Sequence, residues 1–149
     1  MRWALGAMLF CLCTQVMATS EQQAMRVVGD AIAVPFSDVR GSAEEGEQIF
    51  AARDAGHCVL CHQVSGLDAP FQGNIGPALS GIGDRLSPGQ IRLRIADASL
   101  LNAQTIMPSY YLIEGLHRVD ERYRGRTALS GAQIEHLVAY LAQLRSQKQ

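Results

Sequence analysis

The sequence has little net charge and no long run of charge of one sign. Its 149 residues carry 13 Lys and Arg against 14 Asp and Glu, which gives a formal net charge of −1. Proteins that bind nucleic acid through their overall field carry a basic excess, so this composition gives no indication of a nucleic-acid partner. The length fits one domain with a modest core and is too short for two comfortable ones.

The sequence also lacks an apolar run long enough to cross a membrane, since a spanning helix needs about 20 apolar residues. The apolar stretch that begins at Trp3 ends at the polar Thr14. Because Arg2 precedes this stretch and small residues surround Ala18, we predict a signal peptide over residues 1–18 that is cleaved after Ala18. An uncleaved anchor is the alternative. Cleavage predicts export to a bacterial periplasm, with no membrane anchor in the mature form.

Cysteine is scarce once this segment is removed. Cys11 and Cys13 lie inside it, which leaves Cys58 and Cys61 of the four cysteines in the chain. A spare pair in an oxidising compartment tends to form a disulfide. Two residues between cysteines is a spacing shared by redox dithiols, metal sites and haem attachment sites.

No stretch shows the apolar alternation of a half-buried strand. Capping boxes that begin at Ser42, Ser87 and Ser130 predict three helices instead. The first is expected to end near Arg53, and the second has Pro88 at its first position, where proline is favoured. The third carries an apolar stripe at helical spacing, formed by Ile134, Leu137, Val138, Leu141 and Leu144.

We therefore predict an all-α fold, with an extended lead-in over residues 19–41 and a single domain over 42–149. Long loops over 63–86 and 102–129 connect the helices, and Ile91 and Ile95 line the buried side of the second helix. Loops of this length need something large to pack on.

The segment Cys58-Val59-Leu60-Cys61-His62 carries the chemistry. Two thiols one helical turn apart can reach the vinyl groups on one edge of a porphyrin, and the following histidine then lies beneath the ring as an iron ligand. A redox dithiol would follow a strand in a βαβ unit, and none is visible. A structural zinc site needs four ligands, but His117 and His136 are too far apart to complete a known motif. The segment predicts one covalent haem c.

The second iron ligand is predicted by elimination to be Met107. Of the methionines after residue 18, Met25 lies in the lead-in, whereas Met107 lies in a loop before Pro108, which favours an extended backbone. The alternative interpretation is that Met107 fills a gap in the core.

Three histidines are the other candidates for the second iron ligand. His57 is too close to Cys58 to cross the ring. His117 and His136 stay as alternatives, and His136 is expected at the surface of its helix.

Ligation by His62 and Met107 leaves no open position on the iron. A thioether ligand also raises the reduction potential relative to two nitrogen ligands, so such a site transfers electrons. A ligand-binding or catalytic haem protein with an open iron site is the alternative from another class. It would bind carbon monoxide rapidly in the reduced state.

Three further residues are expected near the haem. A carbonyl in Gly76-Pro77 is a rigid acceptor for the second ring nitrogen of His62, although Pro77 is alternatively a simple turn residue. Arg92 and Arg94 are candidates to pair with the haem propionates. The alternative is that both are solvated charges on the helix.

These residues together resemble class I cytochromes c, in which Gly46, Phe50 and Tyr140 look like the contact at which the terminal helices cross. A narrower resemblance, over about residues 29 to 145, is to the SoxX family of monohaem cytochromes. The most specific segments are Phe71-Gln72-Gly73-Asn74-Ile75-Gly76-Pro77 and Thr105-Ile106-Met107-Pro108-Ser109-Tyr110-Tyr111. The others are Ala31-Ile32, residues 58–63, Leu93-Arg94, Tyr123-Arg124-Gly125 and Val138-Ala139-Tyr140-Leu141.

The SoxX resemblance implies a subunit of SoxAX, an L-cysteine S-thiosulfotransferase, in a heterodimer with a SoxA-like haem protein. That complex joins thiosulfate to a cysteine of the SoxYZ carrier, and SoxX passes the electrons to a small soluble cytochrome c. After signal cleavage the only thiols here belong to the haem motif, so no catalysis is expected from this chain alone. A free-standing shuttle cytochrome for an oxidase or reductase is the alternative.

The segment from Tyr110 to Leu129 is longer than in ordinary small cytochromes c. Tyr and Arg are enriched at interface hot spots, so we predict that this segment docks the SoxA-like partner. The residues expected at that interface are Tyr110, Tyr111, Arg122 and Tyr123. The alternative is a solvated loop with scattered arginines.

Overall fold

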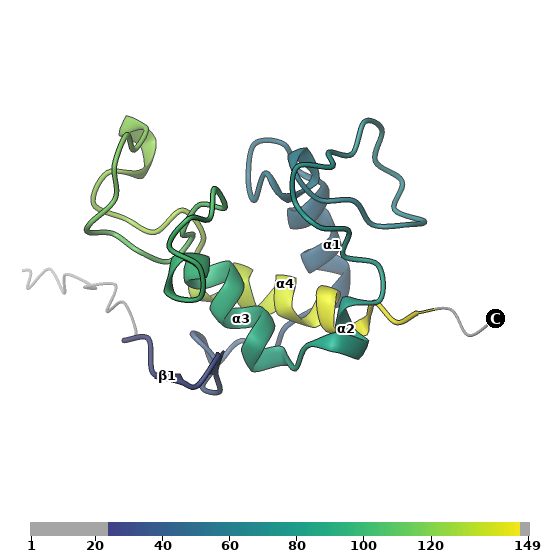
Figure 1. The fold of residues 1–149 in the computed structure, drawn as a ribbon, viewed down its shortest axis with the longest axis horizontal. Coiled ribbons are helices and arrows are strands. Elements are labelled where there is room, and N and C mark those ends of the chain that lie inside the picture. The colour runs from purple at the N-terminus through teal and green to yellow at the C-terminus, as the bar shows by residue number, and fades with distance from the viewer. Residues whose placement is uncertain (1–23, 147–149) are drawn as a thin grey trace, which may run out of the picture.

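The computed structural model describes residues 24–146. Its α-helices are α1 (Ala43–Ala51), α2 (Ile82–Arg85), α3 (Pro88–Asp97) and α4 (Gly131–Gln143). Single turns of 3₁₀ helix lie at Cys58–Leu60, Ala98–Leu100 and Glu121–Tyr123. Helix α4 crosses the middle of the molecule and contacts α1, α2 and α3 (Figure 1). The predicted all-α fold is confirmed, and the predicted signal peptide lies outside the described residues.

A short antiparallel hairpin in the lead-in was not expected from the sequence. Strand β1 (Val27–Val28) pairs with β2 (Ala31–Ile32), and Gly29 takes a positive φ of 61° in the turn between them. Strands of two residues are too short to show an alternating pattern. Within residues 24–146, no helix combines the length and the apolar character that crossing a bilayer requires.

The predicted helix starts are all present, but the first differs in detail. Helices α3 and α4 have reciprocal capping boxes at Ser87 and Ser130. At α1 the Ser42 hydroxyl accepts from the Glu45 backbone N–H, whereas the Ser42 N–H donates to Nδ1 of His136 at 2.9 Å. Because that nitrogen accepts, the proton of a neutral ring lies on Nε2, which is 3.1 Å from the Glu45 carboxylate.

His136 is therefore part of the contact between α1 and α4. It is 8% exposed, so the expectation that it lies at the surface is wrong. Gly46 lets the helices approach, since a Cβ at this position would lie 2.7 Å from that of Tyr140. The Phe50 and Tyr140 rings meet with centroids 5.7 Å apart, which is the contact that the cytochrome c resemblance implied.

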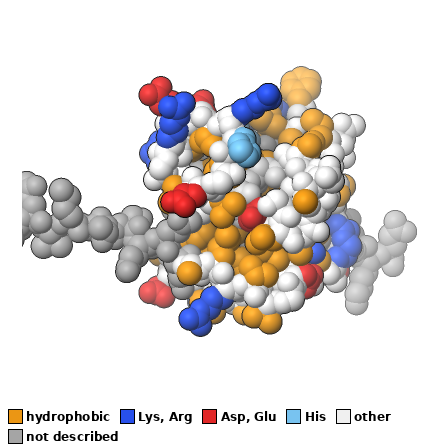
Figure 2. All heavy atoms as spheres, turned by 60° about the vertical axis from the view of Figure 1, so that its left-hand side comes forward, with side chains coloured by type: hydrophobic (Ala, Val, Ile, Leu, Met, Phe, Trp, Pro, Cys, Tyr) orange, Lys and Arg blue, Asp and Glu red, His pale blue; other side chains and the backbone are white. Residues whose placement is uncertain are grey.

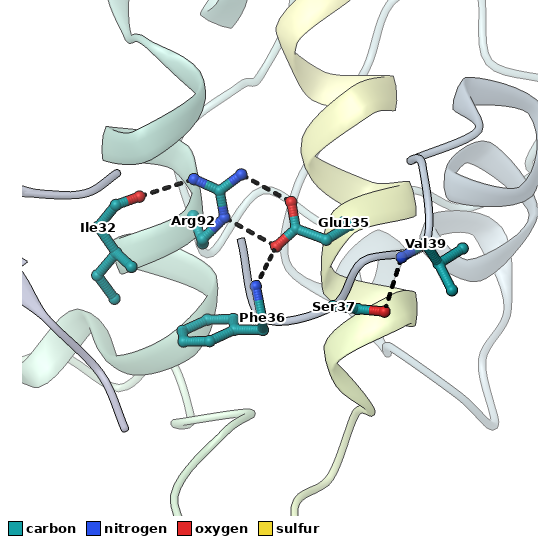
Figure 3. A network of polar contacts seen from close by, with 6 residues as sticks. All are labelled: Ile32, Phe36, Ser37, Val39, Arg92 and Glu135. Carbon is teal, nitrogen blue, oxygen red and sulfur yellow. Dashed lines mark hydrogen bonds and ion pairs between the residues drawn. The ribbon is translucent and has the colours of Figure 1, made fainter. Parts of the chain in front are cut away.

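A buried ion pair joins α3, α4 and the lead-in (Figure 3). The Arg92 guanidinium donates to both carboxylate oxygens of Glu135, at 2.8 and 2.7 Å, and to the Ile32 carbonyl at 2.7 Å. The Phe36 N–H donates to the same carboxylate at 3.0 Å. Ile32 and Phe36 are themselves buried in the core, so part of the predicted lead-in packs with the domain.

We predict that Glu135→Ala destabilises the folded protein by about 3–5 kcal/mol, because it leaves Arg92 buried without its counter-charge. The free energy of unfolding in urea measures the loss. Glu114→Ala, at an exposed position, serves as the control and should leave the midpoint unchanged. The double variant Arg92→Met, Glu135→Leu should recover part of the stability, because it removes the unpaired charge but leaves the Phe36 N–H and the Ile32 carbonyl without their partners. A loss in the double variant as large as in Glu135→Ala would contradict the explanation by an unpaired charge.

Candidate functional site

The helices and the long loops enclose a cavity of about 530 Å³, a volume within the usual range for ligand sites. Side chains of α1, α3 and α4 line it together with loop residues on both sides of the helices. Most of the lining is apolar: Phe50, Ile75, Leu79, Ile82, Leu86, Ile91, Ile95, Ile106, Leu137 and Leu141.

All three residues of the predicted attachment motif line this cavity. Cys58, Cys61 and His62 form a tight turn in which the His62 N–H donates to the Cys58 carbonyl at 2.9 Å. His57 precedes the turn with a left-handed φ of 57°. The two cysteines are not joined in a disulfide, and burial raises the pKa of the Cys58 thiol to about 12.

The alternatives for the two cysteines find no support in this arrangement. Within residues 24–146, no group of three or more His, Cys, Asp or Glu side chains could hold a metal ion, as a zinc site requires. The described strands are the pair β1 and β2, which lie in the lead-in, and helix α1 separates them from Cys58, so neither leads into the cysteine pair as a strand does in a redox βαβ unit.

The loop that follows the motif holds the His62 ring. Nδ1 of His62 lies 2.8 Å from the Pro77 carbonyl oxygen. Because a carbonyl can only accept, Nδ1 carries the proton and the lone pair of Nε2 is left for a metal. Gly76 packs against the ring: a Cβ there would lie 2.5 Å from Cε1 of His62. The acceptor expected in Gly76-Pro77 is therefore in place.

Met107 also lines the cavity, from the loop between α3 and Tyr110. Its side chain is half-buried and packs against the core. Met25 packs against the core as well, although it was expected outside it, but it does not line the cavity.

The two arginines predicted to meet the propionates differ in position. Arg94 lines the cavity, donates to the Gln90 carbonyl at 2.9 Å and lies 3.5 Å from the Asp30 carboxylate. Arg92 is 5% exposed and committed to Glu135, and it does not line the cavity. The prediction that Arg92 pairs with a haem propionate is wrong, because its guanidinium N–H groups donate to Glu135 and to the Ile32 carbonyl.

The prediction that Tyr110 and Tyr111 lie at a docking interface is also wrong. Tyr110 and Tyr111 are 6% and 4% exposed, and Tyr111 stacks on Phe36 with ring centroids 4.0 Å apart. Both belong to the core and not to a docking surface. Arg122 and Tyr123 lie further out: the Arg122 side chain is 67% exposed, and its guanidinium carbon lies 5.6 Å from the centre of the Tyr123 ring.

A second cavity of about 370 Å³ lies between the predicted docking segment and the body of the molecule. Tyr123, His57 and His117 are among its lining residues, whereas His117 does not line the larger cavity. Figure 2 brings this side of the molecule forward and shows hydrophobic side chains gathered near the centre, with charged side chains around them.

Sequence reasoning missed most of the loop residues in the larger cavity. Ile91 and Ile95 were predicted from helical spacing, but Ile75 and Ile106 lie in loops, where no periodicity marks the buried side. Both are largely exposed, at 67% and 79%. The available signals were the position of Ile75 beside Gly76 and that of Ile106 beside the candidate ligand Met107.

Residues 43–145 match the family model for cytochrome c. The chain belongs to the cytochrome c family. The crystal structure of SoxXA from P. pantotrophus is similar to this cytochrome, with a TM-score of 0.73 and 33% identity. The match covers 82% of this chain and 95% of that chain. No curated protein matches this sequence.

The cytochrome is an electron-transfer protein with one covalent haem c. Its residues fit the group: two thiols and a histidine with a free Nε2 lone pair line one apolar cavity. Cys58 and Cys61 would hold the porphyrin edge, and the iron supplies reversible one-electron chemistry. The structural match confirms the resemblance to SoxX that the sequence segments indicate.

We predict that Gly76→Ala displaces the His62 ring and weakens its hydrogen bond to Pro77. The imidazole then donates less charge to the iron, so the reduction potential should rise, and overpacking should cost about 1–3 kcal/mol of stability. Redox titration and urea unfolding of the holoprotein measure the two effects. Gln63→Ala, at the exposed neighbour of His62, is the control. An unchanged potential in Gly76→Ala would show that Gly76 does not hold the ring.

Proposed function

We propose that this cytochrome is the electron-transfer subunit of a periplasmic SoxAX-type complex that oxidises thiosulfate. The similarity to the SoxXA structure, which extends over 95% of that chain, supports this role. In the proposed reaction a bond forms between the terminal sulfur of thiosulfate and the thiol sulfur of a SoxYZ cysteine. One proton and two electrons are released. Since one haem iron takes one electron at a time, this subunit would relay the electrons singly to a small soluble cytochrome c.

The positions of the cysteines support the assignment of electron transfer to this subunit and of the sulfur chemistry to its partner. Cys58 and Cys61 are the only cysteines within residues 24–146, and both line the haem cavity. Haem attachment uses both thiols, which leaves none in this part of the chain for a step on a protein-bound sulfur. The sulfur chemistry then belongs to a SoxA-like partner, and we expect no catalysis from this subunit alone.

His62 and Met107 are the proposed iron ligands. Nε2 of His62 has its lone pair free, and Met107 is the methionine in the cavity lining. The other candidates are less well placed: His136 is bound between Ser42 and Glu45, and His117 lines the second cavity only. Two protein ligands close the iron to exogenous molecules, as suits an electron relay.

Arg122 and Tyr123 are the proposed docking residues for the SoxA-like partner. They lie on the outer part of the segment over residues 110–129, beside the second cavity, to which Tyr123 contributes. A stacked Arg–Tyr pair at the surface is typical of interface hot spots.

We predict that the tagged holoprotein co-purifies with a SoxA-like haem protein when the two are co-expressed. Arg122→Ala with Tyr123→Ala should weaken capture at least tenfold, because hot-spot truncations cost about 2 kcal/mol or more. Arg40→Ala, another exposed arginine, should capture as much partner as the wild type. If the unsubstituted protein purifies alone at every salt concentration, the chain is a free-standing shuttle. Undiminished capture by the variant with both Arg122→Ala and Tyr123→Ala would contradict only the proposal that these two residues dock the partner.

Met107→Ala should leave one coordination position of the iron without a protein ligand. We predict that this variant loses the far-red sulfur-to-iron band of the ferric protein and binds carbon monoxide rapidly when reduced. The wild type should bind it slowly, because a ligand must first leave. Met25→Ala, at the other methionine packed on the core, should keep the band and the slow binding. Rapid binding by the wild type would show an open site and would exclude Met107 as a ligand.

A further inference from the structure

The carboxylate of Asp97 is buried at the C-terminal end of α3, where its side chain is outside the haem cavity lining. It is 3% exposed, and one of its oxygens, Oδ1, accepts three hydrogen bonds. Two come from Ser99, through its N–H at 3.1 Å and its hydroxyl at 2.6 Å, and the third comes from the Ser109 hydroxyl at 2.6 Å. A buried carboxylate is tolerated only when it is compensated in this way.

The two serines lie at the two ends of the loop that carries Met107. Ser99 is in the 3₁₀ turn Ala98–Leu100 where the loop begins, and Ser109 follows Met107 by two residues. Their bonds to one oxygen atom join the beginning and the end of the loop. Closing a loop at its base reduces the conformations open to the residues between its ends.

The part of the loop after Ser109 and the part around Met107 differ in their other hydrogen bonds. Beyond Ser109, the N–H of Tyr110 donates to Ile95 at 3.4 Å and that of Tyr111 donates to Ala96 at 3.2 Å, so this arm runs along the last turn of α3. Around Met107 the contacts are local: its N–H donates to the Thr105 hydroxyl at 3.2 Å. Pro108 has no N–H to donate and fixes its own φ. The Ser109 hydroxyl is therefore the side-chain bond nearest to Met107 that ties the loop to a helix.

We propose that Asp97 is a positioning residue, which holds Met107 in the haem cavity by clamping the base of its loop through Ser109. This inference rests on the proposed ligation of iron by Met107. A thioether is a weak, neutral ligand, and its apparent affinity falls in proportion to the fraction of time that the loop spends in the binding conformation. The clamp raises that fraction without touching the iron.

The two serines provide a matched comparison in the ferric holoprotein. Ser109→Ala removes the bond that reaches the Met107 arm, whereas Ser99→Ala removes a bond of equal length to the same oxygen and keeps the Ser99 N–H bond. Added imidazole competes with the thioether for iron. We expect its apparent affinity to rise about tenfold to a hundredfold in Ser109→Ala, since a hydrogen bond to a charged group is lost. The far-red sulfur band should weaken in parallel, and Ser99→Ala should resemble the wild type.

A second pair of variants distinguishes the effect of the Ser109 hydroxyl from the effect of side-chain packing at that position. Thr and Val at position 109 have the same shape, so Ser109→Thr should retain the wild-type imidazole affinity and Ser109→Val should behave like Ser109→Ala. Equal shifts in Ser99→Ala and Ser109→Ala, or in the Thr and Val variants, would overturn the proposal, because Asp97 would then act only on general stability.

A wild type that lacks the sulfur band would overturn the proposal as well, since Met107 would not be a ligand. Co-purification with a SoxA-like protein does not depend on that band. The failure of the clamp and the failure of the proposed function therefore give different results.

Discussion

The buried ion pair between Arg92 and Glu135 is the interaction on which the arrangement of the chain depends. It fastens α3 to α4 and also holds the lead-in, through the Ile32 carbonyl and the Phe36 N–H. The next residue of α4, His136, makes the polar contact with the start of α1. Two adjacent residues on one helix therefore connect it to three other parts of the fold. Such buried pairs add little net stability compared with apolar residues of the same size, but they discriminate strongly against arrangements that leave one partner unpaired.

These polar contacts lie away from the haem cavity, since Arg92, Glu135 and His136 do not line it. Leu137 and Leu141 of α4 line the cavity together with Ile91 and Ile95 of α3. The same helices thus use one set of positions for contacts with each other and another set for the haem. A c-type cytochrome of this size relies on its cofactor as part of its core, because few residues are left to fill the space between the helices.

Local signals in the sequence predicted the helices and the attachment site. Capping serines and helical spacing located α1, α3 and α4, and the order of Cys58, Cys61 and His62 indicated the haem. The errors concern long-range pairing. Arg92 and Arg94 occupy similar positions in the sequence, but Glu135, 43 residues after Arg92, takes only Arg92. Tyr110 and Tyr111 are polar enough for a surface, and only the fold shows that both are buried, with Tyr111 stacked on Phe36 and the backbone of both bonded to α3. Nothing local distinguishes such residues from exposed ones.

We expect the close approach of Gly76 to the His62 ring to influence the speed of electron transfer as well as the geometry of the site. The ring lies against a backbone without a Cβ and is tied at its far nitrogen to a carbonyl whose own residue is a proline. As the proposed iron ligand, an imidazole held in this way should move little when the iron changes its charge. The nuclear rearrangement that accompanies each electron transfer is then small in both directions, so the protein can accept and release electrons over a small driving force.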